Sequence, residues 1–265
     1  MELATQIGGA VTEGLAYLGA LATLGGRAAY FTFVAPLRGK PLRLQRAISQ
    51  AMQVGVGALP ILSLITFFIG LILALQGAYE LRKFGALNYV ASAVAISMTR
   101  ELGPLITAIV VIGRSGSAFA AEIGTMKVTE EIDALETMAI NPIHFLVTPK
   151  FLAMIVMLPC LTIWANFMGV LGGSLFGVAQ ANFVFTGYIR ASLDALFLRD
   201  IVTGLIKSVM FGITITAVGC HEGLSTGAGA EQVGRSTTRA VVVSIFLVIL
   251  VDLVFTTLFF FVSGA

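Results

Sequence analysis

The sequence predicts an all-α membrane protein: an N-terminal helix lying in the membrane interface, five transmembrane helices, and an acidic helix outside the bilayer between the second and third. Hydrophobic residues make up 57% of the chain and charged residues 11%, and the mean hydropathy is +0.97. A soluble domain usually carries about 25% charged residues. Residues 47–79 and 151–189 contain no charge, and about 20 apolar residues of helix cross a bilayer core.

Residues 1–46 form the amphipathic interfacial region, and residues 47–265 form the five-span domain. Glu13 and Arg27 interrupt the apolar stretch 1–35, which favours a helix in the interface over a full span. No basic segment follows Met1, so a cleaved signal peptide is not expected.

The five spans are assigned from the apolar runs. The second run is too long for one straight crossing, and we expect it to break near Gly103-Pro104. Gly169, Gly173 and Gly177 recur at four-residue spacing, which lets helix backbones approach closely. The predicted spans are about 52–79 (with a kink at Pro60), 87–121, 149–178, 199–220 and 238–262.

Basic residues predict the orientation, because they concentrate on the cytoplasmic side. With the N-terminus in the cytoplasm, nine basic residues lie inside and four outside. The nine are Arg27, Arg38, Lys40, Arg43, Arg46, Lys127, Lys150, Arg235 and Arg239, and the four are Arg82, Lys83, Arg190 and Arg199. The acidic helix and the 221–237 loop then face the cytoplasm.

Other classes of function find little support. A net charge of +2 does not indicate nucleic acid, and Cys160 and Cys220 have no metal-ligand spacing, so we expect no metal site. The stretch 229–236 has the spacing of a phosphate-binding loop, but Arg235 replaces the required Lys and no strand precedes it. No nucleophile–base pair is visible either, so we expect no catalysis and no cofactor in this chain.

Charged residues inside apolar segments point to function because each costs several kcal/mol in lipid. Arg100 and Glu101 precede Gly103-Pro104, which disturbs the helical ladder and can open a polar niche. They could form the polar lip of a substrate cavity, or an ion-pair network that fixes helix packing.

Four more charges favour structural roles. Arg114 and Glu122 lie about 12 Å apart along one helix face and cannot touch, so each is expected to find a partner on another helix or to reach the cytoplasmic interface. Lys207 and Asp252 fall at similar depths in antiparallel spans. We therefore expect a buried Lys207–Asp252 ion pair that is architectural rather than part of a proton path.

The acidic helix, residues 128–138, carries an apolar stripe that a fully solvated helix would not need. Thr129 is expected to cap its start. The stripe should dock into a groove of a partner, with the acids facing basic residues around that groove. The stripe is Ile132, Leu135 and Met138, and the acids are Glu130, Glu131, Asp133 and Glu136.

Over residues 45–262 the chain resembles the MlaE/YrbE permeases, membrane subunits of ABC transporters that work with MCE-domain lipid-binding proteins. Several specific strings carry the resemblance together. They are Leu75-Gln76-Gly77, Arg100-Glu101-Leu102-Gly103-Pro104, Gly113-Arg114-Ser115-Gly116-Ser117-Ala118, Ala121-Glu122-Ile123-Gly124-Thr125-Met126, Glu130 to Met138 with Asn141-Pro142, Ile206-Lys207-Ser208, and Gly234-Arg235-Ser236-Thr237-Thr238-Arg239.

The resemblance implies an interfacial elbow helix plus five spans, and a homodimer that encloses a lipid cavity in the bacterial inner membrane. It implies that the 128–138 helix is a coupling helix on a separate ATPase subunit, which uses the ATP. The cargo would be phospholipid or a related lipid passed to or from an MCE partner. The implied cavity residues are Leu73, Leu81, Phe84, Arg100, Glu101 and Leu102.

Two other functions stay open from the sequence. A proton-coupled secondary transporter could use Arg100, Glu101, Arg114 and Glu122 as a relay, and would need no ATPase. A membrane scaffold would use the same charges only to hold its helices together.

Overall fold

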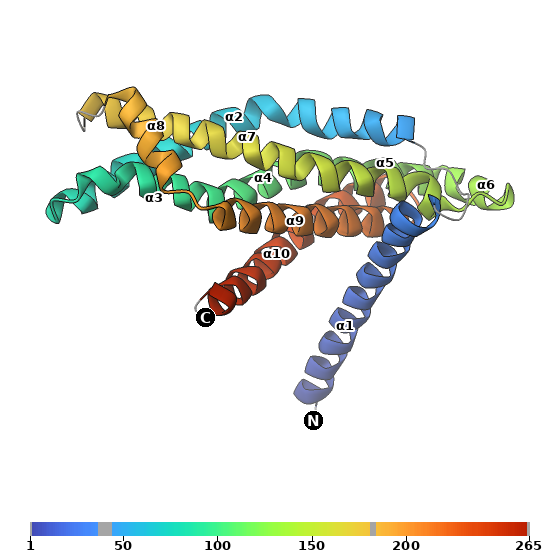
Figure 1. The fold of residues 1–265 in the computed structure, drawn as a ribbon. Helices are drawn as coiled ribbons and strands as arrows, with labels where there is room; N and C mark the ends of the chain where they lie inside the picture. The colour runs from blue at the N-terminus through green and yellow to red at the C-terminus, as the bar shows by residue number, and fades with distance from the viewer. Residues whose placement is uncertain (1, 37–43, 181–183, 264–265) are drawn as a thin grey trace. The chain divides into compact units, whose positions relative to one another are not determined.

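The computed structural model describes residues 2–36, 44–180 and 184–263, and every regular element within these ranges is helical (Figure 1). Three residues of the basic stretch, Arg38, Lys40 and Arg43, lie outside the described residues. The α-helices are α1 Glu2–Ala29, α2 Leu44–Lys83, α3 Val90–Ser97, α4 Gly103–Val111, α5 Ser117–Val128, α6 Glu131–Thr137, α7 Thr148–Gln180, α8 Phe185–Asp194, α9 Leu198–Leu224 and α10 Ala230–Ser263.

Five helical segments in the described ranges are long and apolar enough to cross a membrane, which confirms the predicted fold class. They are Leu44–Lys83, Leu87–Val128, Ile143–Gly177, Leu198–Leu224 and Ala230–Phe261. Helix α1 precedes these segments and is not among them. Its place in the interface stays a prediction.

The second span differs from the prediction because it does not break at Gly103-Pro104. Its helical path runs from Leu87 to Val128, and a π-helical turn, η4 (Met98–Leu102), stands directly before Gly103. Proline has no N–H to donate, and the wider π-turn absorbs that defect while the helix continues. A second π-turn, η5 (Ile112–Gly116), holds Arg114.

The chain divides into two compact units, which are described separately. One comprises residues 1–50, 115–153 and 213–244, and the other comprises residues 51–114, 154–212 and 245–265. In the first unit, α9 packs closely on α5 and on the residue before it: a Cβ atom at Gly219 would meet the Gly116 carbonyl oxygen, and one at Gly223 would meet Ile123. Glycine therefore sets the α5–α9 distance.

In the second unit the predicted glycine stripe of α7 packs against other helices of the same chain. A Cβ atom at Gly70 of α2 would collide with the Gly169 carbonyl oxygen, and one at Gly177 would collide with the Tyr188 ring of α8. Helix α8 also lies against α3, where Ser192 Oγ donates to the Ala91 carbonyl oxygen at 3.4 Å. Burial raises the pKa of the Tyr188 hydroxyl to about 12.

The connection between the last two spans is shorter than the predicted 221–237 loop. Helix α9 continues to Leu224 and α10 begins at Ala230. In the stretch 229–236, which has phosphate-loop spacing in the sequence, every residue after Gly229 thus lies in the first turns of a helix.

Candidate functional site

The second unit holds a buried ion cluster around Lys207 of α9. The Lys207 side chain is 2% exposed, and its ammonium lies 2.5 Å from Glu101 Oε2 and 2.9 Å from Asp252 Oδ1. It also donates a hydrogen bond to Thr256 Oγ1 at 2.7 Å. The Lys207–Asp252 ion pair is confirmed. Glu101 completes the cluster, so one cation faces two carboxylates.

Close helix packing places these side chains together. Gly204 stands one turn before Lys207 on α9, and a Cβ atom there would collide with the Thr99 carbonyl oxygen of η4. The missing side chain lets α9 approach the π-turn that carries Glu101. Burying an ammonium without a counter-charge costs free energy. Lys207 can therefore be buried between these helices only because the Glu101 carboxylate lies close to it.

Arg100 and Glu101 point to different partners, as adjacent residues on a helix should. The Arg100 Nε lies 3.5 Å from Asp200 Oδ1, while Glu101 faces Lys207. The Asp200 carboxylate also accepts a hydrogen bond from the Phe197 amide at 3.1 Å. Arg100 is therefore tied to the start of α9 and Glu101 to its middle.

A cavity of about 110 Å³ opens beside this cluster. Charged and hydroxyl groups line one part of it, and two phenylalanines of α10 line the rest. The lining residues are Arg100, Glu101, Thr203, Lys207, Thr256, Phe259 and Phe260. A wall of this mixed kind can receive a molecule with one polar and one apolar end.

The four apolar residues predicted for the lipid cavity do not line this space. Leu73, Leu81 and Leu102 are partly buried and pack against a core made by α2, α3 and η4, whose members include Val90 and Met98. The Phe84 side chain lies beyond the end of α2 and is 79% exposed. Their place beside a lipid cavity stays a prediction.

In the first unit, the acidic helix differs from its prediction in two respects. Helix α6 spans only Glu131–Thr137, and Glu130 takes a left-handed conformation (φ 60°) at its start. Thr129 does not cap it, because its hydroxyl donates back to the Thr125 carbonyl oxygen at 3.0 Å. Val128 belongs to α5.

The apolar stripe of α6 is also divided. Ile132 and Leu135 are buried in this chain, at 3% and 8% exposure, whereas Met138 is 62% exposed. Two of the three stripe residues thus anchor the helix to its own chain and do not dock elsewhere. The acids Glu130, Glu131, Asp133 and Glu136 are all exposed, and Asp133 pairs with Lys127 at 2.7 Å.

Arg114 and Glu122 find separate surroundings, as their spacing predicted. Glu122 Oε2 lies 2.6 Å from the ammonium of Lys150 on α7, whose side chain is 2% exposed. In the second unit, the Arg114 guanidinium lies against α2, where a Cβ atom at Gly57 would collide with it. Lys150 was assigned from the sequence only to the cytoplasmic side, because nothing in its local pattern marks burial.

A further buried acid, Glu222 of α9, has no counterpart in the predicted sites. Its carboxylate accepts a hydrogen bond from the Tyr17 hydroxyl of α1 at 2.6 Å and lies 3.5 Å from Arg239 Nε. Burial, and then this hydrogen bond, raise the pKa of the Tyr17 hydroxyl. The sequence could have marked Glu222 as a candidate, because it is an acid near the end of an apolar helix. It could not have shown the partner, because Tyr17 lies 205 residues away in α1.

Comparison with known proteins gives the family. A model of the permease MlaE family matches residues 47–258. A probable ABC transporter permease protein of Rickettsia typhi is 41% identical over 234 residues, 88% of this chain and 90% of the relative. The intermembrane phospholipid transport system permease protein MlaE of Haemophilus influenzae is 36% identical over 241 residues, 89% of this chain and 91% of the relative.

A plant relative is the chloroplastic protein TRIGALACTOSYLDIACYLGLYCEROL 1 of Arabidopsis thaliana. It is 36% identical over 228 residues, 86% of this chain and 65% of the plant protein. The family match covers most of the five-span region, including the Lys207 cluster and α6. This chain therefore belongs to the MlaE permease family.

Proposed function

We propose that this chain is the non-catalytic permease subunit of an ABC transporter that moves phospholipid or a related lipid between the inner membrane and an MCE-domain partner. The observation that carries the proposal is the Lys207–Glu101–Asp252 cluster beside Phe259 and Phe260, in a family with a relative named for intermembrane phospholipid transport. The charges would meet a polar headgroup, and the phenylalanines would meet an acyl chain.

The size of the cavity supports a homodimer. Pockets for drug-sized ligands usually measure about 300–1,000 Å³, and the cavity beside Lys207 holds about 110 Å³. One copy therefore offers only part of a phospholipid site. In the proposal two copies enclose the lipid, with Leu73, Leu81, Phe84 and Leu102 adding apolar wall to Arg100 and Glu101.

Energy would arrive through α6. Buried Ile132 and Leu135 fix this helix to α5 and its surroundings, so a force on its exposed side would be passed into the chain. The ATPase subunit would contact that side through Glu130, Glu131, Asp133, Glu136 and Met138. ATP would be used by the partner, and this chain would hold no cofactor.

The protein would sit in the bacterial inner membrane with its N-terminus in the cytoplasm. Five apolar helices and the permease family indicate a multi-pass protein of that membrane. The cytoplasmic N-terminus rests on the excess of basic residues on that side. On this orientation α6 faces the ATPase.

The assembly can be tested by purifying the tagged chain from gently solubilised native membranes. We expect an ATPase and an MCE-domain protein to co-purify with the wild type, and the ATPase to be lost from Glu131→Lys/Glu136→Lys. Glu80→Lys is the matched control, because Glu80 is an exposed acid of α2 in the other unit. Recovery of the chain alone from wild-type membranes would contradict the proposal and favour the proton-coupled transporter.

A scaffold is tested by a different variant. If the charges only hold helices together, Glu101→Gln in a correctly assembled complex should leave lipid transfer unchanged. The proposal expects transfer to fall while the ATPase still co-purifies.

A further inference from the structure

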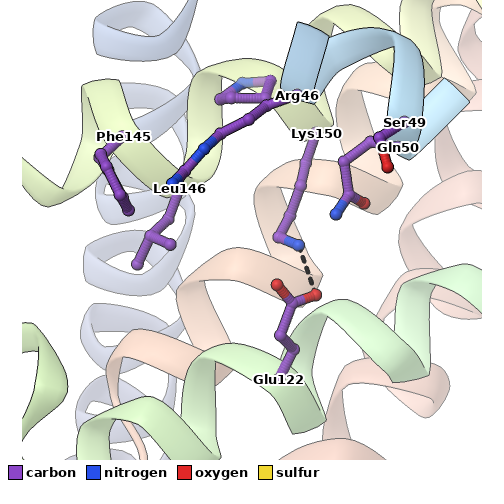
Figure 2. Close-up of a pocket in the computed structure, with 8 residues that line it drawn as sticks. Arg46, Ser49, Gln50, Glu122, Phe145, Leu146 and Lys150 are labelled. Atoms are coloured by element: carbon purple, nitrogen blue, oxygen red, sulfur yellow. Dashed lines mark hydrogen bonds and ion pairs between the residues drawn. The ribbon is translucent and has the colours of Figure 1, made fainter. Parts of the chain in front are cut away.

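A second cavity, of about 230 Å³, lies in the first unit and shares no residue with the cavity beside Lys207. The start of α2, the middle of α5, the π-turn η6 (Ile143–Val147) and the start of α7 surround it (Figure 2). Its lining includes Arg46, Ser49, Gln50, Glu122, Phe145 and Lys150.

The lining carries an excess of positive charge. The Lys150 ammonium is neutralised by Glu122 at 2.6 Å, and it also lies 4.9 Å from the Phe119 ring centroid. The Arg46 guanidinium stacks 3.8 Å from the Phe145 ring centroid and has no carboxylate within ion-pair distance in the described part of the chain. Two cations and one anion leave one positive charge for a ligand.

Hydrogen-bonding groups are also available there. The side chains of Ser49 and Gln50 make no hydrogen bond to another described residue, and Figure 2 shows Gln50 extending beside Lys150 toward Glu122. A guanidinium presents a planar fork of donors that matches a phosphate, and an aromatic ring behind it holds that fork in place. Arg46, over the Phe145 ring, therefore suits a singly charged phosphodiester, and Gln50 and Ser49 add hydrogen-bond donors elsewhere in the same lining.

The position along the chain selects a lipid as the source of that phosphate. Arg46 is followed directly by the uncharged residues 47–79 of the first span, and Lys150 stands near the start of the third. Ends of spans lie at headgroup depth, and basic pockets between spans bind anionic headgroups. The apolar part of the lining, Phe145, Leu146 and Pro149, would meet the glycerol end of the acyl chains.

We propose that this pocket binds the phosphodiester headgroup of an anionic phospholipid from the surrounding bilayer, with Arg46 as its main ligand. This is a resident-lipid site additional to the transport cavity, and it does not depend on the proposed transport. In the predicted orientation it faces the cytoplasmic leaflet, which carries the anionic lipids.

The test is lipid binding to the purified full-length chain. The chain is incubated with equal amounts of dioleoyl-phosphatidylglycerol and dioleoyl-phosphatidylcholine, and bound lipid is counted by native mass spectrometry. The wild type should favour phosphatidylglycerol, because the choline cation of phosphatidylcholine would meet a pocket that already carries an unpaired positive charge. Arg46→Gln removes that charge together with a charge-assisted hydrogen bond to the phosphate, so bound phosphatidylglycerol should fall about tenfold and the preference should be lost. Arg235→Gln, which removes an exposed charge of α10 in the same unit, should keep it.

Two further variants guard against misfolding and simple charge effects. Arg46→Lys keeps the charge but loses the fork, and Gln50→Leu keeps Arg46 but loses the amide. Both should fold and show an intermediate preference. An equal loss in Arg46→Gln and Arg235→Gln, or a wild type with no preference, would overturn the proposal. Arg46-dependent binding of inorganic phosphate without preference for phosphatidylglycerol would also overturn it, in favour of a free-anion site.

Discussion

The ammonium of Lys207 lies 2.5 Å from the carboxylate of Glu101, a residue 106 positions earlier in the chain. Asp252 approaches the same ammonium from α10 at 2.9 Å. Three helical segments of the second unit therefore meet at one buried charge, which lies within the candidate membrane span Leu198–Leu224. The arrangement makes each of these side chains depend on the other two.

Removing the cation should destabilise the protein strongly. Lys207→Met leaves two carboxylates facing each other without a counter-charge, and breaking a buried pair in this way costs about 3–5 kcal/mol. We expect a lower Tm in detergent. The triple variant Lys207→Met/Glu101→Gln/Asp252→Asn removes all three charges and should regain most of the loss. An unchanged Tm in Lys207→Met would show that the cluster does not hold the helices.

The approach of α9 to η4 can be tested without changing any charge. Gly204→Ala places a methyl group on the Thr99 carbonyl oxygen, and overpacking of this kind costs about 1–3 kcal/mol. Gly187→Ala is the matched control, because a Cβ atom there meets nothing within 4 Å. Thermal unfolding should separate the two variants, and equal Tm values would contradict the packing described.

The attachment of α1 should depend on one hydroxyl. Tyr17→Phe removes the hydrogen bond to buried Glu222, which is expected to cost about 1–3 kcal/mol, because an acceptor is left with one partner fewer. Hydrogen exchange in α1 should rise. Tyr79→Phe, which removes an exposed hydroxyl in the other unit, should change nothing. Unchanged exchange in Tyr17→Phe would show that Arg239 and packing alone hold the helix.

The anchoring of α6 should depend on its buried residues. Ile132→Ala removes a side chain that is 3% exposed, and truncations of this kind cost about 2–5 kcal/mol in a packed core. We expect faster proteolysis within residues 130–138. Met138→Ala should fold as the wild type, because Met138 is 62% exposed. Equal proteolysis of both variants would mean that α6 is not held by its stripe.

The sequence predicts the spans well because a long apolar run in a bilayer is stable as a helix that crosses it. Depth along two antiparallel helices also predicted the Lys207–Asp252 pair. It could not reveal that Glu101 joins them, because this depends on a π-turn and on Gly204, which act through the distance between two helices.

The misjudged features have local causes. Thr129 has the residue type of a cap, but the left-handed turn at Glu130 directs its hydroxyl back into α5. Ile132 and Leu135 form an apolar stripe that could pack either against a partner protein or within its own chain. Helical spacing of apolar residues does not distinguish these two cases. Glu222 and Lys150 are buried by partners that lie far away in the sequence.

The central claim is that ATP hydrolysed by a partner drives lipid through this chain. The most direct measurement is transfer of a fluorescent phospholipid out of proteoliposomes that contain the complex co-purified with the wild type. We predict transfer that requires ATP, is abolished in Glu131→Lys/Glu136→Lys and is retained in Glu80→Lys. Lipid movement driven by a pH gradient without ATP, or an ATP-hydrolysing complex that moves no lipid, would contradict the account.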